Sequence, residues 1–257
     1  MNITTEQLEG MLSAQYVQNG LLPKRRHFER IFKDSFVLYQ PQNLVSGDFY
    51  WVGQKNDNQY LVVGDCTGHG ISASLTSVLA LNLLEYGIMN KGIKRPSKIL
   101  YEVDKRYVES FKGANDEKFD NPWIDLAIVC VNKETKTLYF SGANRKMLVV
   151  KANGESKVYR SKGTPIGSWQ IYSAPSFDTV TVPYETGDCV FLGSDGYQDQ
   201  FGGPKNKKFG SRKLHELLIQ NAGLQLKEQR KALKQALESW KQDAVQTDDI
   251  CIVGVRL

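Results

Sequence analysis

The chain has 257 residues, 41% of them hydrophobic, which is enough to bury the core of one large or two small globular domains and excludes a disordered protein. Its 33 basic and 28 acidic residues are mixed along the chain, so the net charge of +5 favours a solvated surface over a nucleic-acid-binding one. No uninterrupted apolar run of about 18 residues and no secretory signal pattern is present, so we expect a cytoplasmic chain without a membrane segment.

In chain order, the first predicted element is an amphipathic helix over residues 3–20, within an N-terminal segment of 1–26 that precedes one domain of 27–257. Strands rich in β-branched and aromatic residues follow at 35–39, 48–54 and 60–66. A well-buried helix is predicted over 71–89, and a second helix begins at Pro96. Strands return at 123–132, 137–143, 146–154, 157–161, 179–184 and 189–196. Two helices, from about Ser211 and about Leu226, precede a last strand at 250–257.

The order of these elements predicts the fold class. The helices come in pairs and do not alternate singly with strands, which argues against a doubly wound parallel sheet. We therefore expect an α+β protein with mainly antiparallel sheets covered by pairs of helices.

Four segments share one pattern, in which an apolar strand ends or is interrupted at an aspartate. They are VSGD around Asp48, LVVGD around Asp65, VFLGSD around Asp195 and QTDD at Asp248 and Asp249. A carboxylate is costly beside a buried apolar run unless a cation neutralises it, so these aspartates predict a cation site at one end of the sheets. We interpret Asp125 as a simple strand-end residue.

The candidate ligands are oxygens. The four cysteines occur singly and no histidine has ligand spacing, which favours Mg²⁺ or Mn²⁺ over Zn²⁺. Two such ions roughly 3.5 to 4 Å apart suit the hydrolysis of a phosphate ester. Gly64, Gly68 and Gly70 allow a tight turn in which the Cys66 carbonyl can face a metal.

Six ordered motifs carry a family resemblance: VSGDFYW, VVGDCTGHG, LYFSGANRK, GTPIG, GSDGYQDQFGG and DDICIVGV. In this order and spacing they resemble the SpoIIE/RsbU-type branch of the metal-dependent phosphatases of the protein phosphatase 2C superfamily. The resemblance runs from about Pro23 to Leu257 and implies an α-β-β-α sandwich of two antiparallel sheets with a dinuclear site at one edge.

The resemblance also implies roles for the candidate residues. Asp65 bridges two divalent cations, Mn²⁺ or Mg²⁺, and the Cys66 carbonyl completes the coordination of one of them. Asp195 and Asp248 hold the other cation, and Asp48 orients water at the metals. Asp249 adjoins the ligand position and ranks below Asp248 as a metal ligand.

Some positions depart from the wider superfamily. The histidine proposed as general acid in eukaryotic members lies two residues after the bridging aspartate, whereas His69 lies four residues after Asp65, so we favour a role in capping backbone groups. Asp199 matches an aspartate associated with a third metal, but Asn144 replaces its usual companion, which disfavours a tightly held third ion. The phosphate-binding arginine has only positional candidates, which are Arg25, Arg26 and Arg30.

The resemblance implies a protein serine/threonine phosphatase. Its substrate would be a regulatory protein, usually a phosphorylated STAS-domain anti-sigma-factor antagonist, in a bacterial partner-switching pathway. The N-terminal helix would contact its own domain, a second copy of the chain or a signalling coiled coil of a longer, membrane-tethered parent. Two alternatives are a binding module of this fold without turnover, which the retained aspartates disfavour, and a nucleic-acid binder, which the mixed charge disfavours.

Overall fold

Two five-stranded sheets form the centre of the protein in the computed structural model, which describes residues 4–111, 122–168 and 175–257. The first sheet has the strand order β1 (Asp34–Gln40), β12 (Ile250–Arg256), β9 (Cys189–Gly193), β6 (Lys146–Val150) and β7 (Ser156–Arg160). The second has the order β2 (Asp48–Lys55), β3 (Asn58–Cys66), β4 (Ile124–Asn132), β5 (Thr137–Ala143) and β8 (Val180–Pro183). Neighbouring strands pair antiparallel throughout both sheets, as predicted.

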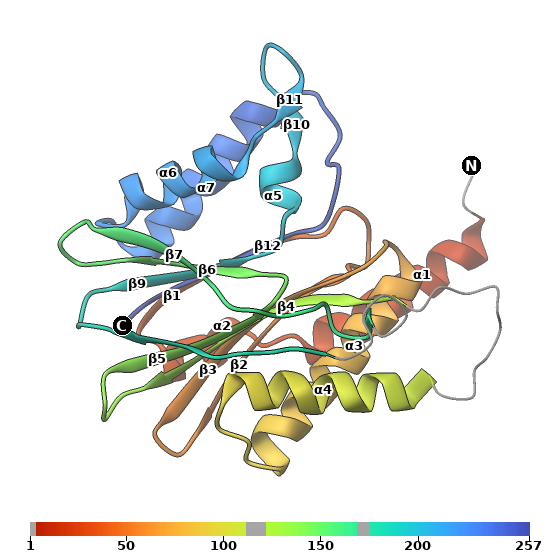
Figure 1. Ribbon diagram of the computed structural model, residues 1–257. Helices are drawn as coiled ribbons and strands as arrows, with labels where there is room; N and C mark the ends of the chain where they lie inside the picture. The colour runs from red at the N-terminus through yellow and green to blue at the C-terminus, as the bar shows by residue number, and fades with distance from the viewer. Residues whose placement is uncertain (1–3, 112–121, 169–174) are drawn as a thin grey trace.

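Helices cover the outer faces of the two sheets (Figure 1). The first sheet carries α6 (Ser211–Asn221) and α7 (Leu226–Lys241), and the second carries α3 (Ile71–Glu85), the π-helical η1 (Tyr86–Asn90) and α4 (Pro96–Phe111). One hydrophobic cluster lies between the sheets, and one lies between each sheet and its helices. This four-layer arrangement confirms the predicted α-β-β-α sandwich.

Three short elements were not predicted. These are α2 (Arg25–Ile31), α5 (Gly196–Asp199) and a hairpin of β10 (Phe201–Gly202) with β11 (Lys207–Lys208). Helix α2 forms because Phe28 and Ile31, three residues apart, are both buried beside strand β2. The proposed domain boundary after residue 26 therefore falls inside a helix, and the division into 1–26 and 27–257 stays a prediction.

Helix α3 is less buried than its composition suggested. Ile71 and Leu75 in its first turns are 47% and 63% exposed, whereas Ala80 and Leu84 are fully buried. By length and composition alone, Ile71–Asn90 is apolar enough to cross a membrane, but half of it is buried inside the protein. Since its buried side packs on β2, β3 and α4, it has the environment of a core helix.

The N-terminal helix α1 (Thr5–Leu21) confirms the first predicted element and lies beside α3 (Figure 1). A capping box between Thr4 and Gln7 fixes its start. Most of its side chains are exposed, but Gln18 is only 3% exposed because it reaches into the loop before β2. This glutamine attaches α1 to the domain.

Candidate metal centre

Strand register brings three aspartates together at one end of the second sheet. Asp48 opens β2 directly opposite Asp65 on β3, and Asp65 is directly opposite Asp125 on β4. Directly opposed residues of antiparallel strands have their Cβ atoms about 5 Å apart on the same face, so the three carboxylates form one row.

The first sheet contributes two more aspartates to the same place. Asp195 follows β9 and Asp248 precedes β12, and these two strands are neighbours. Ser194 links the sheets, because its hydroxyl donates a hydrogen bond of 2.5 Å to Asp48 Oδ2. We call these five residues the carboxylate cluster: Asp48, Asp65, Asp125, Asp195 and Asp248.

The guanidinium of Arg145 lies inside the carboxylate cluster. Its Nη2 atom ion-pairs with Asp65, with Asp195 Oδ2 at 3.2 Å and with Asp125 Oδ2 at 3.3 Å. Only 11% of the Arg145 side chain is exposed, so three carboxylates share one buried positive charge. Because one guanidinium compensates only part of the charge of three ionised carboxylates, further cations would stabilise the cluster.

Burial and mutual repulsion shift the ionisation of the cluster. Burial raises the pKa of Asp65 to about 7; Arg145 opposes this shift, and Asp195 adds to it. Burial, followed by the charge of Asp65, raises the pKa of Asp48 well above its ordinary value. The pKa of Asp248 is also raised, mainly by burial. Each shift has the sign expected of buried carboxylates with too little positive charge nearby.

The donor set fits hard divalent cations. Among the described residues no group of three or more His, Cys, Asp or Glu side chains is arranged to hold a metal ion, and the Arg145 guanidinium lies between three of the carboxylates. The oxygens around this guanidinium are carboxylate oxygens, the type of donor that Mg²⁺ and Mn²⁺ prefer. The Oδ1 atom of Asp125 is buried without a hydrogen-bond partner, as expected of an oxygen intended for a cation.

Both carboxylate oxygens of Asp249 are used in hydrogen bonds to the backbone. It is 5% exposed, and its two oxygens accept hydrogen bonds from the backbone amides of Gln42 at 2.7 Å and Gly47 at 2.8 Å. These bonds fix the loop that leads into Asp48. The geometry therefore favours Asp248 over Asp249 as a ligand, in the order in which the sequence ranked them.

Two of the three glycines predicted to form the turn around Asp65 lie in the loop after it, whereas Gly64 lies within β3, packed against Phe49. Gly68 and Gly70 have φ angles of 90° and 78°, which favour glycine. Cys66 has a buried side chain, and its carbonyl oxygen lies close to Gly47, 2.9 Å from the point where a Cβ would be. His69 is exposed, and no described residue makes a hydrogen bond with its side chain, so its predicted role in capping backbone groups has no support there.

The residues expected around a third ion are engaged elsewhere. Asp199 Oδ2 forms an ion pair of 2.9 Å with Lys208 of β11. Asn144, with a φ angle of 58°, donates a hydrogen bond of 2.7 Å to Asp125 Oδ2. Asn144 therefore orients a member of the cluster.

Sequence reasoning missed two residues of the site. Asp125 is a member of the cluster and not only a strand-end residue, and its alignment with Asp65 needed the strand register. Arg145 is the arginine beside the carboxylates, whereas Arg25 of α2 is highly exposed and pairs with Glu29 at 2.6 Å. The GANRK motif at the end of the apolar strand β5 contains Arg145, and it was the sequence pattern from which this arginine could have been predicted.

Known proteins resemble the chain along most of its length. A family model described as Stage II sporulation protein E (SpoIIE) matches residues 55–257. The SiaA-PP2C domain of Pseudomonas aeruginosa is 27% identical, with a TM-score of 0.86 over 97% of this chain and 96% of that one. The PP2C phosphatase domain of SpoIIE from Bacillus subtilis, with a fragment of its regulatory domain, is 19% identical (TM-score 0.64, 87% of this chain and 62% of that one). RsbX in complex with magnesium is 15% identical (TM-score 0.61, 87% and 94%). None of the curated proteins compared with the chain matches it.

The sandwich and its carboxylate cluster define a serine/threonine protein phosphatase of the protein phosphatase 2C type. Because the SpoIIE family model matches more than half of the sequence, the chain belongs to the SpoIIE family. The resemblance stated from the sequence motifs is thereby confirmed.

Proposed function

We propose that the carboxylate cluster binds two divalent cations, Mn²⁺ or Mg²⁺, and hydrolyses phosphoserine or phosphothreonine on a regulatory protein. The observation that carries this proposal is the meeting of aspartates from the ends of both sheets around the single guanidinium of Arg145. Cations would stabilise such a concentration of buried negative charge, and two hard cations, when bound, activate water and offset the charge of a phosphoryl group.

Four side chains of the cluster have a role in this proposal, and Asp125 pairs with Arg145. Asp65, at the centre of the row on the second sheet, would bridge the two cations, and the Cys66 carbonyl would complete one of the two sites. Asp195 and Asp248, from the first sheet, would hold the other cation. Asp48 is held by the Ser194 hydroxyl, so it is positioned to orient the attacking water. Since Asp48 is fully buried, this orientation is rigid.

Arg145 has a second role in this proposal. Its planar guanidinium has several donors, which match the oxygens of a phosphoryl group. It lies at the cluster on the residue before β6, so it would hold the phosphoryl group against the reacting water. This assignment replaces Arg25, Arg26 and Arg30 as the phosphate-binding arginine.

Family membership supports a regulatory phosphoprotein as substrate. We infer a phosphorylated STAS-domain anti-sigma-factor antagonist or relative, dephosphorylated in a cytoplasmic partner-switching pathway. Helix α1 exposes Leu8, Leu12 and Tyr16, the last with 83% of its surface accessible, which supports a homodimer contact through this helix. Deleting residues 1–20 should therefore change the oligomeric state or the activity. An unchanged oligomeric state together with an unchanged rate of hydrolysis would contradict this role.

The test is release of phosphate from an aryl phosphate in manganese buffer. We expect Asp65→Asn and Asp195→Asn to lower turnover at least about a hundredfold, because each removes a proposed ligand. Asp57→Asn is a matched control, since Asp57 is an exposed turn residue between β2 and β3. Equal activity of the wild type in manganese and in chelator would refute the proposal. Absence of manganese binding by calorimetry, together with tight binding of a partner, would favour a regulatory module without turnover.

A further inference from the structure

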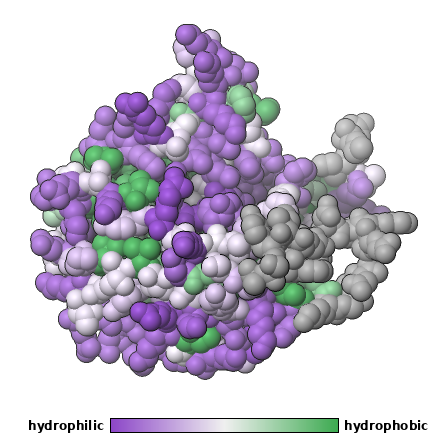
Figure 2. All heavy atoms as spheres, in the orientation of Figure 1, coloured by the Kyte–Doolittle hydropathy of each residue, from purple (hydrophilic) through white to green (hydrophobic). Residues whose placement is uncertain are grey.

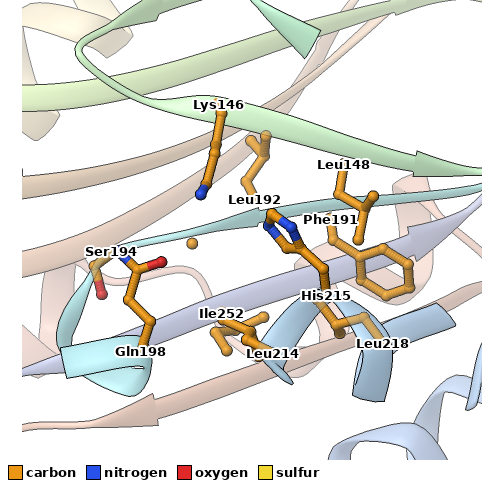
Figure 3. Close-up of a pocket in the computed structure, with 11 residues that line it drawn as sticks. Lys146, Leu148, Phe191, Leu192, Ser194, Gln198, Leu214, His215, Leu218 and Ile252 are labelled. Atoms are coloured by element: carbon orange, nitrogen blue, oxygen red, sulfur yellow. The ribbon is translucent and has the colours of Figure 1, made fainter. Parts of the chain in front are cut away.

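A small cavity lies on the outer side of the first sheet, next to the carboxylate cluster. It has a volume of about 40 Å³, is open to solvent on one side, and is lined by residues of β6, β9, β12, α5 and α6. One end is apolar, with Leu148, Phe191 and Leu218 among its lining residues. At the other end, Lys146 and Gln198 extend toward a common space beside the His215 ring (Figure 3).

The polar end of the cavity and the adjacent strand β7 carry positive charges that no described acidic residue pairs with. Lys146 is directly opposite Arg160 of β7, and both lie near His215 of α6. Among the described residues, the side chains of Lys146, Arg160, His215 and Gln198 make no hydrogen bond or ion pair. Burial, followed by Arg160, lowers the pKa of Lys146, and burial, followed by Lys146, lowers the pKa of His215. Both shifts are in the direction expected of basic groups that lack an anion.

Two of these side chains, Lys146 and Gln198, are close in sequence to residues of the metal centre, but they lie on the opposite face of the first sheet. Lys146 immediately follows Arg145, and Ser194, which bonds to Asp48, lines the cavity. Along β6, Met147 is buried between the sheets and Leu148 is buried under the helices. Because alternate residues of a strand face opposite sides, Lys146 lies on the helix side with Leu148 and not among the carboxylates. It is therefore positioned for an anionic group next to the phosphoryl group that reacts.

The size and lining of the cavity favour a small anionic group. Its volume of about 40 Å³ is a few times the roughly 10 to 15 Å³ that a water molecule needs, so a carboxylate fits. The apolar end suits the methylene groups that carry a side-chain carboxylate.

We propose that Lys146, Arg160, His215 and Gln198 form a subsite for an acidic side chain of the substrate protein, close to its phosphorylated residue. The inference rests on the proposed function and narrows the substrate to a phosphoserine or phosphothreonine with a neighbouring glutamate or aspartate. The lysine ammonium and the arginine guanidinium supply the charge, and the imidazole and amide supply hydrogen-bond donors.

Two peptides with an uncleavable phosphonate analogue of phosphoserine test this subsite. One peptide has a glutamate immediately before and immediately after the analogue, and the other peptide has glutamines at these two positions. Their affinities for the full chain in manganese buffer are measured by fluorescence anisotropy. We expect wild-type protein to bind the glutamate peptide about tenfold more tightly, and Lys146→Gln to reduce this ratio to about twofold or less, by weakening only the glutamate peptide.

The controls separate charge from fold. Lys157→Gln removes the same charge from an exposed position on β7 and should keep the tenfold ratio. Lys146→Arg keeps the charge and should retain most of the preference, while Arg160→Gln, at an exposed site, should lower the ratio about threefold. Circular dichroism checks the fold of each variant.

Two results would overturn the subsite. In the first, the wild-type protein binds the two peptides with equal affinity. In the second, Lys146→Gln lowers the affinity for both peptides by the same factor, since that would place Lys146 on the phosphoryl group. Aryl phosphate hydrolysis by the wild type is measured separately. Its absence would refute the proposed function, whereas its presence without a peptide preference would refute only the subsite.

Discussion

Gln18 connects helix α1 to the loop that leads into the carboxylate cluster, and we predict that its replacement by alanine destabilises the protein. Its Nε2 donates to the Ser46 carbonyl at 2.6 Å and to Ser77 Oγ at 2.9 Å, and its Oε1 accepts from the Ser46 amide at 3.1 Å. The Ser46 hydroxyl in turn accepts a hydrogen bond of 3.0 Å from the amide of Asp48. One buried side chain thus satisfies both backbone groups of the residue two positions before Asp48.

The magnitude follows from the groups that lose a partner. Gln18→Ala leaves the amide and the carbonyl of the fully buried Ser46 unsatisfied, at a cost of about 1 to 3 kcal/mol each. Since Ser77 keeps its bond to the Ser74 carbonyl, we expect the free energy of unfolding to fall by about 2 to 6 kcal/mol in total. Loosening Ser46 should also weaken manganese binding about tenfold, as removal of a group that supports a ligand does.

Urea unfolding of the metal-free protein, followed by circular dichroism, measures the first effect, and calorimetric titration with manganese measures the second. Asn19→Ala is the matched control, because Asn19 is exposed and its side chain makes no hydrogen bond with a described residue. That control should stay within about 0.5 kcal/mol of wild type. A Gln18→Ala variant as stable as the control, with unchanged manganese affinity, would refute the coupling.

Three further predictions concern charge and packing. Because burial raises the folded-state pKa of Asp65 to about 7, its contribution to stability is full below the unfolded pKa of about 3.9 and is lost as the pH rises through 7. The unfolding free energy in chelator should thus decrease from pH 6 to pH 8, and less so in Asp65→Asn, which removes the titrating group; a flat wild-type profile would contradict this. Gly196→Ala should destabilise by about 2 kcal/mol or more and impair manganese binding, because its Cβ would lie 1.9 Å from the Asp249 carbonyl oxygen; a fully stable variant would show that the loop adapts. Burial raises the pKa of Asp188, but hydrogen bonds from two backbone amides and a lysine ammonium lower it overall, so its contribution is present above the unfolded pKa of about 3.9 and is lost as the pH falls through the folded pKa. The stability deficit of Asp188→Asn in urea should therefore be large at pH 7 and shrink as the pH falls below about 3.9, and a deficit independent of pH would refute this origin.

Local sequence was sufficient for the predicted strands and helix pairs and for the main ligand candidates. Strand β3, for example, is a continuous apolar run that ends at Asp65, and helix α4 begins at Pro96 with Ile99, Leu100 and Val103 on one buried face. These patterns depend on residues a few positions apart, and an aspartate at the end of an apolar run is conspicuous wherever the strand lies in the sheet. Asp48, Asp65, Asp195 and Asp248 were found in this way.

Other members of the site depended on how distant segments meet. Asp125 joins the cluster through strand register, and Arg145 joins it because the residue before β6 lies between the ends of the two sheets. The buried hydrogen bonds of Asp249 and Gln18 likewise connect segments far apart in sequence.

The sequence by itself thus determined the main strands and helices, the antiparallel α+β class and four of the five aspartates of the cluster, because hydrophobic periodicity and turn chemistry act over short distances. The tertiary structure alone decided which carboxylates share the Arg145 guanidinium, and it alone showed that both oxygens of Asp249 accept backbone hydrogen bonds. Those outcomes depend on strand register and on the contact between two sheets, and no pattern within a single segment specifies either.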